Sequence, residues 1–319
     1  MTNPLEPLMD TLRERIRQSS ETVEPWHSYW HHRPTRDFPP KAIRDEADYA
    51  GGERLCLAIT QTDLPAKAQK ALVKRWCEVL PTLANVKTLW FQSRTSQEMF
   101  EAACAMPALE GLYVKWGALT DMSPVRQARG LRALHIGGSP AMQHLEALAE
   151  VPGLEWLELE NIRALSDIGF VSGLSGLSGL RGLSLAGGDI GTGNVVKMDS
   201  LAALSGLRVL EWLALSYVRV ADGSLAPLAG LPKLRVLLVS NQFPAREYAR
   251  LAGRRPEVWC ERFSPVGEPV NWSTCKRCGE KRMVSLTGKE WPMLCLDCDA
   301  GKIAGAREAF AGWVEEGRA

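Results

Sequence analysis

Residues 154–159 read Leu-Glu-Trp-Leu-Glu-Leu, and the apolar pattern of this stretch returns between about Leu83 and Cys260. Each copy carries apolar residues at its first, fourth and sixth positions. Seven copies begin at Val86, Leu109, Leu131, Leu154, Leu180, Leu210 and Leu234. Subtraction of these residue numbers gives spacings of 23, 22, 23, 26, 30 and 24 residues. A repeat of this period predicts a solenoid, in which stacked units bury one continuous core.

The phrase L-x-x-L-x-L resembles the leucine-rich repeat family, specifically its short class with repeats of about 22 to 24 residues. The resemblance implies an α/β solenoid, in which each L-x-L core is one strand of a parallel concave sheet and its leucines point inward. It also implies that the protein presents a surface for binding, and it does not imply any particular catalytic activity. The asparagine that follows the strand in this family is missing, and the equivalent positions hold Arg94, Gly117, Ser139, Ile162, Gly188, Val218 and Gln242. We therefore expect irregular curvature, with helices in the longer return legs 96–106 and 141–150.

The segments around the repeats predict two end covers. Residues 1–52 read as an N-terminal helix and an arm rich in Trp, His and Pro, and residues 53–82 read as a strand and a helix that cap the first repeat. The repeats occupy residues 83–262. Residues 263–270 contain two prolines and a glycine and predict a linker, and residues 271–319 predict a small zinc-binding module that ends in a helix.

Composition and charge exclude several classes of protein. The 319 residues are 45% hydrophobic and 24% charged, which is ordinary for a soluble globular chain. The formal net charge of +1 gives no global attraction to nucleic acid or to an anionic membrane. No apolar run approaches the roughly 20 residues needed to cross a bilayer, and the N-terminus lacks the pattern of a secretory signal. We therefore expect a cytoplasmic protein that does not bind membranes.

Two cysteine pairs near the C-terminus predict a metal site. The sequence reads Cys275-Lys-Arg-Cys278 and, after sixteen residues, Cys295-Leu-Asp-Cys298. This spacing is typical of a tetrahedral four-thiolate zinc site, because each tight turn aims two sulfurs at one point. Four protein ligands leave no position for water or substrate, so we expect one structural zinc ion. With its two knuckles, hairpin and helix, the module resembles a zinc ribbon or treble clef.

Aromatic and charged residues alternate with the leucines of the repeated phrase and should point out of the concave sheet. The predicted partner-binding residues are Trp90, Tyr113, Lys115, His135, Trp156, Glu158, Glu160, Trp212 and Tyr217. Exposed aromatic residues of this kind commonly anchor a protein partner. In the alternative, the N-terminal arm with Trp26, Tyr29 and Trp30 folds over the same face and buries it within the chain.

No sequence pattern supports catalysis. His135 and Glu158 could form an acid–base pair, but no nucleophile motif or cofactor fingerprint accompanies them. We therefore expect a non-enzymatic adaptor that recognises a protein partner on its concave face, with no small-molecule substrate. The alternative is a nucleic-acid-associated adaptor, in which basic residues around the first cysteine pair contact phosphate. Over residues 271–319, eight Lys or Arg stand against seven Asp or Glu, so protein binding is favoured.

Overall fold

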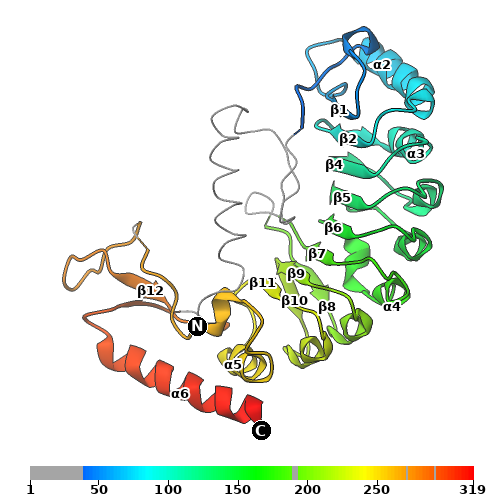
Figure 1. Cartoon of the computed structure of the whole chain (residues 1–319). Helices are drawn as coiled ribbons and strands as arrows, with labels where there is room; N and C mark the ends of the chain where they lie inside the picture. The colour runs from blue at the N-terminus through cyan, green and yellow to red at the C-terminus, as the bar shows by residue number, and fades with distance from the viewer. Residues whose placement is uncertain (1–38, 189–192, 271, 291) are drawn as a thin grey trace.

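The computed structural model describes residues 39–188, 193–270, 272–290 and 292–319. These residues form a curved solenoid with a parallel sheet along its inner side and short helices along its outer side (Figure 1). A smaller unit, with a two-stranded hairpin and a long helix, lies at the C-terminal end of the arc. The prediction of a repeat solenoid with a parallel concave sheet is confirmed.

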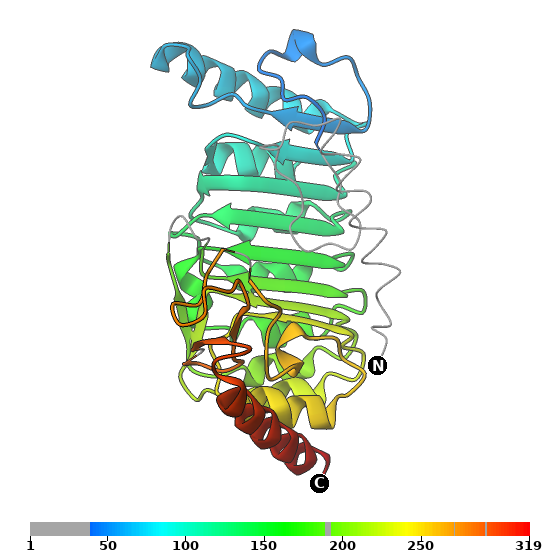
Figure 2. The same ribbon diagram turned by 90° about the vertical axis from the view of Figure 1, so that its left-hand side faces the viewer.

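Each repeat contributes one strand to the sheet, and the strands follow one another in chain order (Figure 2). Across the sheet they are β1 (Arg54–Leu57), β2 (Thr88–Phe91), β4 (Gly111–Ala118), β5 (Ala133–Gly138), β6 (Trp156–Glu160), β7 (Gly182–Ala186), β9 (Trp212–Ser216) and β11 (Val236–Val239). The short β3 (Thr95–Ser96) also pairs with β4. Because neighbouring parallel strands require a crossover connection, every return leg passes over the outer side of the solenoid.

The leucines of the repeated phrase form ladders through the sheet. Leu134, for example, pairs with Leu112 on one side and with Leu157 on the other. Alternate side chains of a strand point to opposite faces, so these leucines all enter the core between the sheet and the return legs. Burial of one leucine side chain stabilises the fold by about 2 kcal/mol. A shift of one residue would move every leucine out of the core, so the ladder fixes the register.

The return legs are mostly short 3-10 turns. They are α3 (Gln97–Cys104), η3 (Ser123–Gln127), η4 (Leu145–Glu150), η5 (Arg163–Ser166), α4 (Val171–Leu174), η6 (Ala202–Gly206) and η7 (Ala226–Gly230). The helix predicted over 96–106 is present as α3. The helix predicted over 141–150 is instead the 3-10 turn η4, because His144 adopts a left-handed conformation with φ of 60° and leaves only six residues for the element.

The N-terminal end of the solenoid is covered by a helix. The elements of this region are η1 (Glu46–Asp48), α2 (Ala66–Val79) and η2 (Leu80–Thr82). Trp76 of α2 is buried, and its indole N–H donates to the carbonyl oxygen of Arg44 at 2.7 Å. Ile43 forms a parallel bridge with Leu57, so the chain before β1 lies alongside that strand. The helix and arm predicted for residues 1–38 lie outside the described residues.

The stretch from Gly187 to Ser200 contains a strand that the sequence did not indicate. β8 (Val196–Met198) pairs in parallel with β10 (Val218–Val220) and forms a small second sheet. Gly187 lies against the backbone of the next repeat, because a Cβ atom on Gly187 would stand 2.2 Å from the carbonyl oxygen of Tyr217. Part of the long spacing between the fifth and sixth repeats is therefore occupied by β8, which pairs outside the main sheet.

The solenoid ends in a helix, and the C-terminal unit follows it. The elements are α5 (Ala245–Arg254), η8 (Glu261–Phe263), β12 (Met283–Ser285), β13 (Met293–Cys295) and α6 (Ala300–Arg318). Trp259 forms a parallel bridge with Val236, so one further residue continues the sheet beyond β11. Among the described residues, no helix, α6 included, has the length and apolar character needed to cross a membrane.

The C-terminal unit is attached to the solenoid mainly through α6, which packs on α5. In the segment predicted as a linker, 263–270, the N–H of Val270 donates to the carbonyl oxygen of Met283 at 2.8 Å, so the segment lies along the hairpin. On α6, Phe310 is buried in the same apolar cluster as the leucine ladders, and Trp313 packs against that cluster. The second half of α6 therefore joins the core of the solenoid and covers its end, while Val284, Leu294 and Ile303 form a small separate core within the unit.

Candidate metal centre and partner-binding surface

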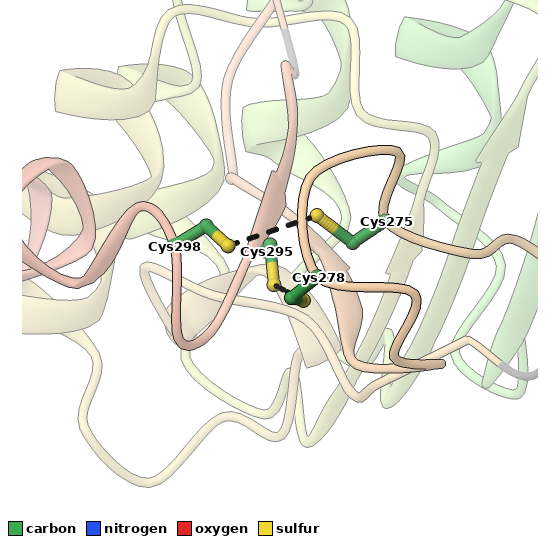
Figure 3. Close-up of side chains that lie close together, drawn as sticks. All are labelled: Cys275, Cys278, Cys295 and Cys298. Atoms are coloured by element: carbon green, nitrogen blue, oxygen red, sulfur yellow. Dashed lines mark hydrogen bonds between the residues drawn. The ribbon is translucent and has the colours of Figure 1, made fainter.

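Four cysteines meet at one point of the C-terminal unit (Figure 3). Cys275 and Cys278 lie on one tight turn, Cys295 ends β13, and Cys298 lies just before α6. In the first turn the N–H of Gly279 donates to the carbonyl oxygen of Cys275 at 2.9 Å, and Gly279 has a φ of 79°. This left-handed conformation favours glycine, which has no Cβ atom. The predicted convergence of the four thiols is confirmed.

The four sulfurs have the spacing of a tetrahedral ligand set. The Sγ atoms of Cys275 and Cys298 are 3.9 Å apart, and those of Cys278 and Cys295 are 3.6 Å apart. Sulfurs placed about 2.3 Å from one ion at tetrahedral corners would be about 3.8 Å apart. The observed distances are much longer than a disulfide bond of about 2.05 Å, and all four cysteines are free. The residues therefore fit a single metal ion.

Hydrogen bonds within the cluster favour the thiolate at Cys275 and the protonated thiol at Cys298. The backbone N–H groups of Cys278 and Arg277 donate to the sulfur of Cys275 and lower the pKa of that thiol to about 6. The pKa of Cys298 is raised to about 12, first by its hydrogen bond with Cys278 and then by burial. Arg277 also forms an ion pair with Asp299, which ties the two knuckles together. A bound cation would favour the deprotonated form of all four thiols.

The other four cysteines lie apart from this cluster. Burial raises the pKa of Cys56 and of Cys260 to about 12 and that of Cys77 to about 11, and it also raises the pKa of Cys104. A thiol with a raised pKa is protonated at neutral pH and is a poor nucleophile. These four residues therefore act as small apolar side chains within the core.

The second candidate site is the concave face of the sheet. The register places the middle residues of successive strands in one row, which comprises Cys56, Trp90, Tyr113, His135, Glu158, Ser184, Ala214 and Leu238. The first residues of the strands form a neighbouring row, which includes Trp156, Gly182 and Trp212. The aromatic residues of both rows point away from the leucine core, as predicted, and form an apolar cluster of their own.

Most of the predicted partner-binding residues are buried in this cluster. The exposed fractions are 0% for Trp90, 2% for Tyr113, His135 and Glu158, 7% for Trp156 and 8% for Trp212. The expectation that these aromatic side chains are exposed is not met, because they pack against one another and against Ala42, Leu238 and Trp259. A partner could reach them only after a change of conformation. The alternative cover, the N-terminal arm, falls on residues 1–38, outside the described part of the chain.

A hydrogen-bonded network joins the two rows on β5 and β6. Glu158 Oε2 lies 2.9 Å from Nδ1 of His135, and Glu158 Oε1 accepts a hydrogen bond from the indole N–H of Trp156 at 2.8 Å. The ring of Tyr113 stacks on that of His135, with centroids 4.2 Å apart and an interplanar angle of 6°. Burial of a carboxylate is costly unless it is hydrogen-bonded. These contacts therefore stabilise Glu158 in the cluster and fix the planes of the neighbouring rings.

Gly182 of β7 allows two tryptophans to meet across an intervening strand. A Cβ atom on Gly182 would lie 2.1 Å from the indole ring of Trp156, which therefore lies directly over this glycine. The ring centroids of Trp156 and Trp212 are 5.9 Å apart, and the rings are tilted by 59°. A glycine inside a strand often marks a close approach of this kind. The sequence alone, however, did not predict that the Trp156 side chain fills the space over Gly182.

Three of the predicted partner-binding residues are at least partly exposed, and so is one tryptophan that was not predicted. Lys115 is exposed, Glu160 and Tyr217 are half-buried, and Trp116 is 38% exposed. We call these four residues the edge surface, because they lie at the carboxyl ends of β4, β6 and β9. Trp116 was not among the predicted residues. It follows the repeated phrase, and only the extension of β4 to eight residues brings it into the sheet, paired with Gly138.

Comparison with known proteins finds similarity in structure only. No protein-family model matches the chain, and no curated protein sequence matches it. Internalin C2 of Listeria monocytogenes shares 24% identity over 57% of this chain and 71% of its own, with a TM-score of 0.41. A second internalin of Listeria monocytogenes shares 15% identity over 56% of this chain and 74% of its own, with a TM-score of 0.31. A leucine-rich repeat protein of Leptospira interrogans shares 13% identity over 69% of this chain and 69% of its own, with a TM-score of 0.38. These structural neighbours are leucine-rich repeat proteins.

Proposed function

We propose that this protein is a non-enzymatic adaptor that binds a protein partner on the edge surface of its concave sheet. The observation that carries the proposal is the 38% exposure of Trp116, beside the exposed Lys115. An accessible aromatic ring with polar neighbours is a common anchor of protein interfaces. Because neighbouring strands lie about 4.8 Å apart, Trp116 of β4 and Tyr217 beyond β9 are separated by about 19 Å across the sheet. The two rings are thus placed to hold both ends of one bound segment.

The edge surface lies at the ends of β4, β6 and β9, whose earlier residues Tyr113, Trp156 and Trp212 are packed in the buried concave cluster. Tyr113, three residues before Trp116 on the same strand, is fixed by its stacking on His135. Residues on a rigid scaffold bind with a smaller loss of conformational freedom than residues on a mobile loop. Trp116 and Lys115 of the edge surface are exposed, whereas binding at the six buried residues would separate packed side chains. The edge surface is therefore the site of first contact in this proposal.

We further propose that Cys275, Cys278, Cys295 and Cys298 hold one structural zinc ion. The sulfur spacing and the closed set of four thiolates support zinc, which has no geometric preference of its own and accepts a tetrahedral site. Iron also accepts four thiolates, so the metal is to be identified by elemental analysis of the native protein. The eight cysteines are all free, which fits a reducing compartment such as the cytoplasm.

Affinity purification tests the partner-binding proposal. The full chain is immobilised and exposed to extract of the cells that produce it, and the retained proteins are quantified by mass spectrometry. The double variant Trp116→Ala/Tyr217→Ala is expected to lose the partner, and Trp272→Ala, which removes an exposed tryptophan outside the edge surface, is expected to retain it. Equal retention of the same proteins by the wild type and the double variant would exclude the edge surface.

A further inference from the structure

The most exposed large apolar side chain of the described residues lies beside the metal centre. Trp272 is 75% exposed, against 38% for Trp116. Its position is set by hydrogen bonds on both sides: the N–H of Val270 donates to the carbonyl oxygen of Met283, and the N–H of Cys275 donates to that of Glu280, at 2.8 and 2.9 Å. Trp272 therefore lies on a short loop that runs alongside residues 280–283.

Positive charge is concentrated around this loop. Residues 272–290 contain five Lys or Arg and two Glu, a net charge of +3, whereas residues 292–319 contain three Lys or Arg and five Asp or Glu, a net charge of −2. The net charge of the whole module is close to zero because its two halves carry opposite net charges.

Three lysines of the basic half are available for a ligand. Arg277 and Arg282 are engaged in ion pairs with Asp299 and Asp297. The exposed Lys276, Lys281 and Lys289, in contrast, form no ion pair with any residue in the described part of the chain. Lys276 follows Cys275, and Lys281 follows Glu280, whose carbonyl oxygen accepts from the N–H of Cys275, so both lysines belong to the segments beside Trp272. Lys289 lies at the other end of the hairpin, because the preceding Gly288 is held by Asn241 and lies against Ala245. The other large exposed apolar residues, Trp116 and Val195, belong to the solenoid.

We propose that Trp272, Lys276 and Lys281 form a binding site for single-stranded nucleic acid, separate from the edge surface. An unpaired base stacks on the indole ring, and the adjoining phosphates contact the lysines. A duplex covers the faces of its bases and cannot stack on the ring. A protein interface usually surrounds its aromatic anchor with further apolar contacts, whereas the residues that follow Trp272 in the sequence, Ser273, Thr274, Lys276 and Arg277, are polar or charged apart from the metal-site residue Cys275.

Fluorescence anisotropy tests this proposal on the full, metal-loaded chain. The probe is a fluorescein-labelled oligothymidylate of about twelve nucleotides, long enough for one binding site of this kind. Two phosphate contacts predict a slope of about −1.4 for log affinity against log salt, since each contact on a single strand contributes about −0.7. Trp272→Ala should lower the affinity roughly tenfold, Trp272→Phe should keep most of it, and Lys276→Gln/Lys281→Gln should flatten the slope.

The control variant is Trp116→Ala, which removes an exposed tryptophan from the solenoid and should leave the affinity unchanged. Metal content and circular dichroism confirm that each variant is folded. A blunt duplex that binds as tightly as the single strand would contradict the base-stacking site. Tight binding of polyglutamate that is lost in Trp272→Ala would assign the surface to an acidic protein instead. The absence of any anisotropy change at low salt would overturn the proposal.

Discussion

Gly317 of α6 lies against the backbone of Arg250 in α5, where a Cβ atom on Gly317 would stand 2.2 Å from the Arg250 carbonyl oxygen. The approach is reciprocal, because a Cβ atom on Gly253 of α5 would stand 2.2 Å from the carbonyl oxygen of Val314. Two glycines thus let the last helix of the chain touch the last helix of the solenoid, backbone against backbone. Ion pairs from Arg246 and Arg250 to Glu316 flank the contact.

Substitution of Gly317 should therefore destabilise the C-terminal end. In an open helix, Gly→Ala stabilises by up to about 1 kcal/mol, but the added methyl group here must push two helices apart, and overpacking costs about 1–3 kcal/mol. Gly312 of the same helix has no atom within 4 Å of the added Cβ and provides the matched control. In thermal unfolding, we expect Gly317→Ala to lower Tm and Gly312→Ala to raise it slightly. Equal shifts in both variants would show that the close contact has no energetic role.

Removal of the metal should loosen the same end of the molecule. Without an ion, the turn that contains Cys275 and Cys278 is no longer tied to Cys295 and Cys298. The start of α6, just after Cys298, is then held less firmly. Phe310 would then leave the solenoid core and expose the last repeat to water. By hydrogen exchange, we expect chelation or Cys278→Ser to reduce protection in α5 and β11 while β2 and β4 remain protected, because repeat proteins open locally.

The control for this experiment is Cys77→Ser, which alters a half-buried cysteine outside the cluster. It should keep the full metal content and an unchanged exchange pattern. Protection that falls uniformly from β1 to β11 upon chelation would indicate a solenoid that unfolds as one unit. Protection that stays constant everywhere would show that the metal does not stabilise the C-terminal cover.

A row of alternating charges runs along the start of the strands. Each residue of the row donates a backbone hydrogen bond to the one before it, in the order Glu53, Lys87, Glu110, Arg132, Glu155, Arg181, Glu211 and Arg235. Side-chain ion pairs join several neighbours: Lys87 Nζ is 2.6 Å from Glu53, and Arg132 Nη2 is 2.7 Å from Glu155. Opposite charges directly across a parallel ladder stabilise the sheet, whereas like charges destabilise it.

Reversal of one charge in this row should have a salt-dependent effect. Glu110→Lys places a third cation between Lys87 and Arg132, so Tm should fall at low ionic strength. The loss should shrink in about 1 M salt, where the Debye length is about 3 Å. The same charge change at Glu78, an exposed residue of α2, provides the control. A Tm loss that is identical for both variants and independent of salt would contradict an electrostatic role for the row.

The sequence predicted the fold well wherever a local pattern determines it. The period of the leucines placed the seven strands β2, β4, β5, β6, β7, β9 and β11, since a strand with its leucines on the wrong face cannot bury them. An alternating apolar stretch before the repeats placed β1, and the two-residue β3 was not predicted. The pairing of β8 with β10 was missed, because a strand of three residues in a glycine-rich stretch has no periodicity to detect. The return leg 141–150 carried helical residues but is a 3-10 turn, because the left-handed His144 shortens it.

The candidate sites were predictable to different degrees. Cysteine spacing sufficed for the metal cluster, because two tight turns and one ion account for its whole geometry. The burial of Trp156 and Trp212 could not be predicted, since it depends on packing between residues from different repeats. Asn241 was also missed. Its side chain donates to the carbonyl oxygen of Leu286 at 3.0 Å and accepts from the N–H of Gly288 at 2.6 Å, a contact between residues more than forty positions apart.

The most direct test of the proposed function is the dissociation constant of the captured partner, measured with purified proteins by calorimetry. Loss of two aromatic anchors should cost more than about 1.4 kcal/mol, which is a factor of ten in affinity. We predict at least this loss for Trp116→Ala/Tyr217→Ala, and unchanged affinity for Trp272→Ala. Unchanged affinity in Trp116→Ala/Tyr217→Ala, together with lost binding in a folded Trp156→Ala/Trp212→Ala variant, would contradict the edge surface and place the partner on the buried concave cluster.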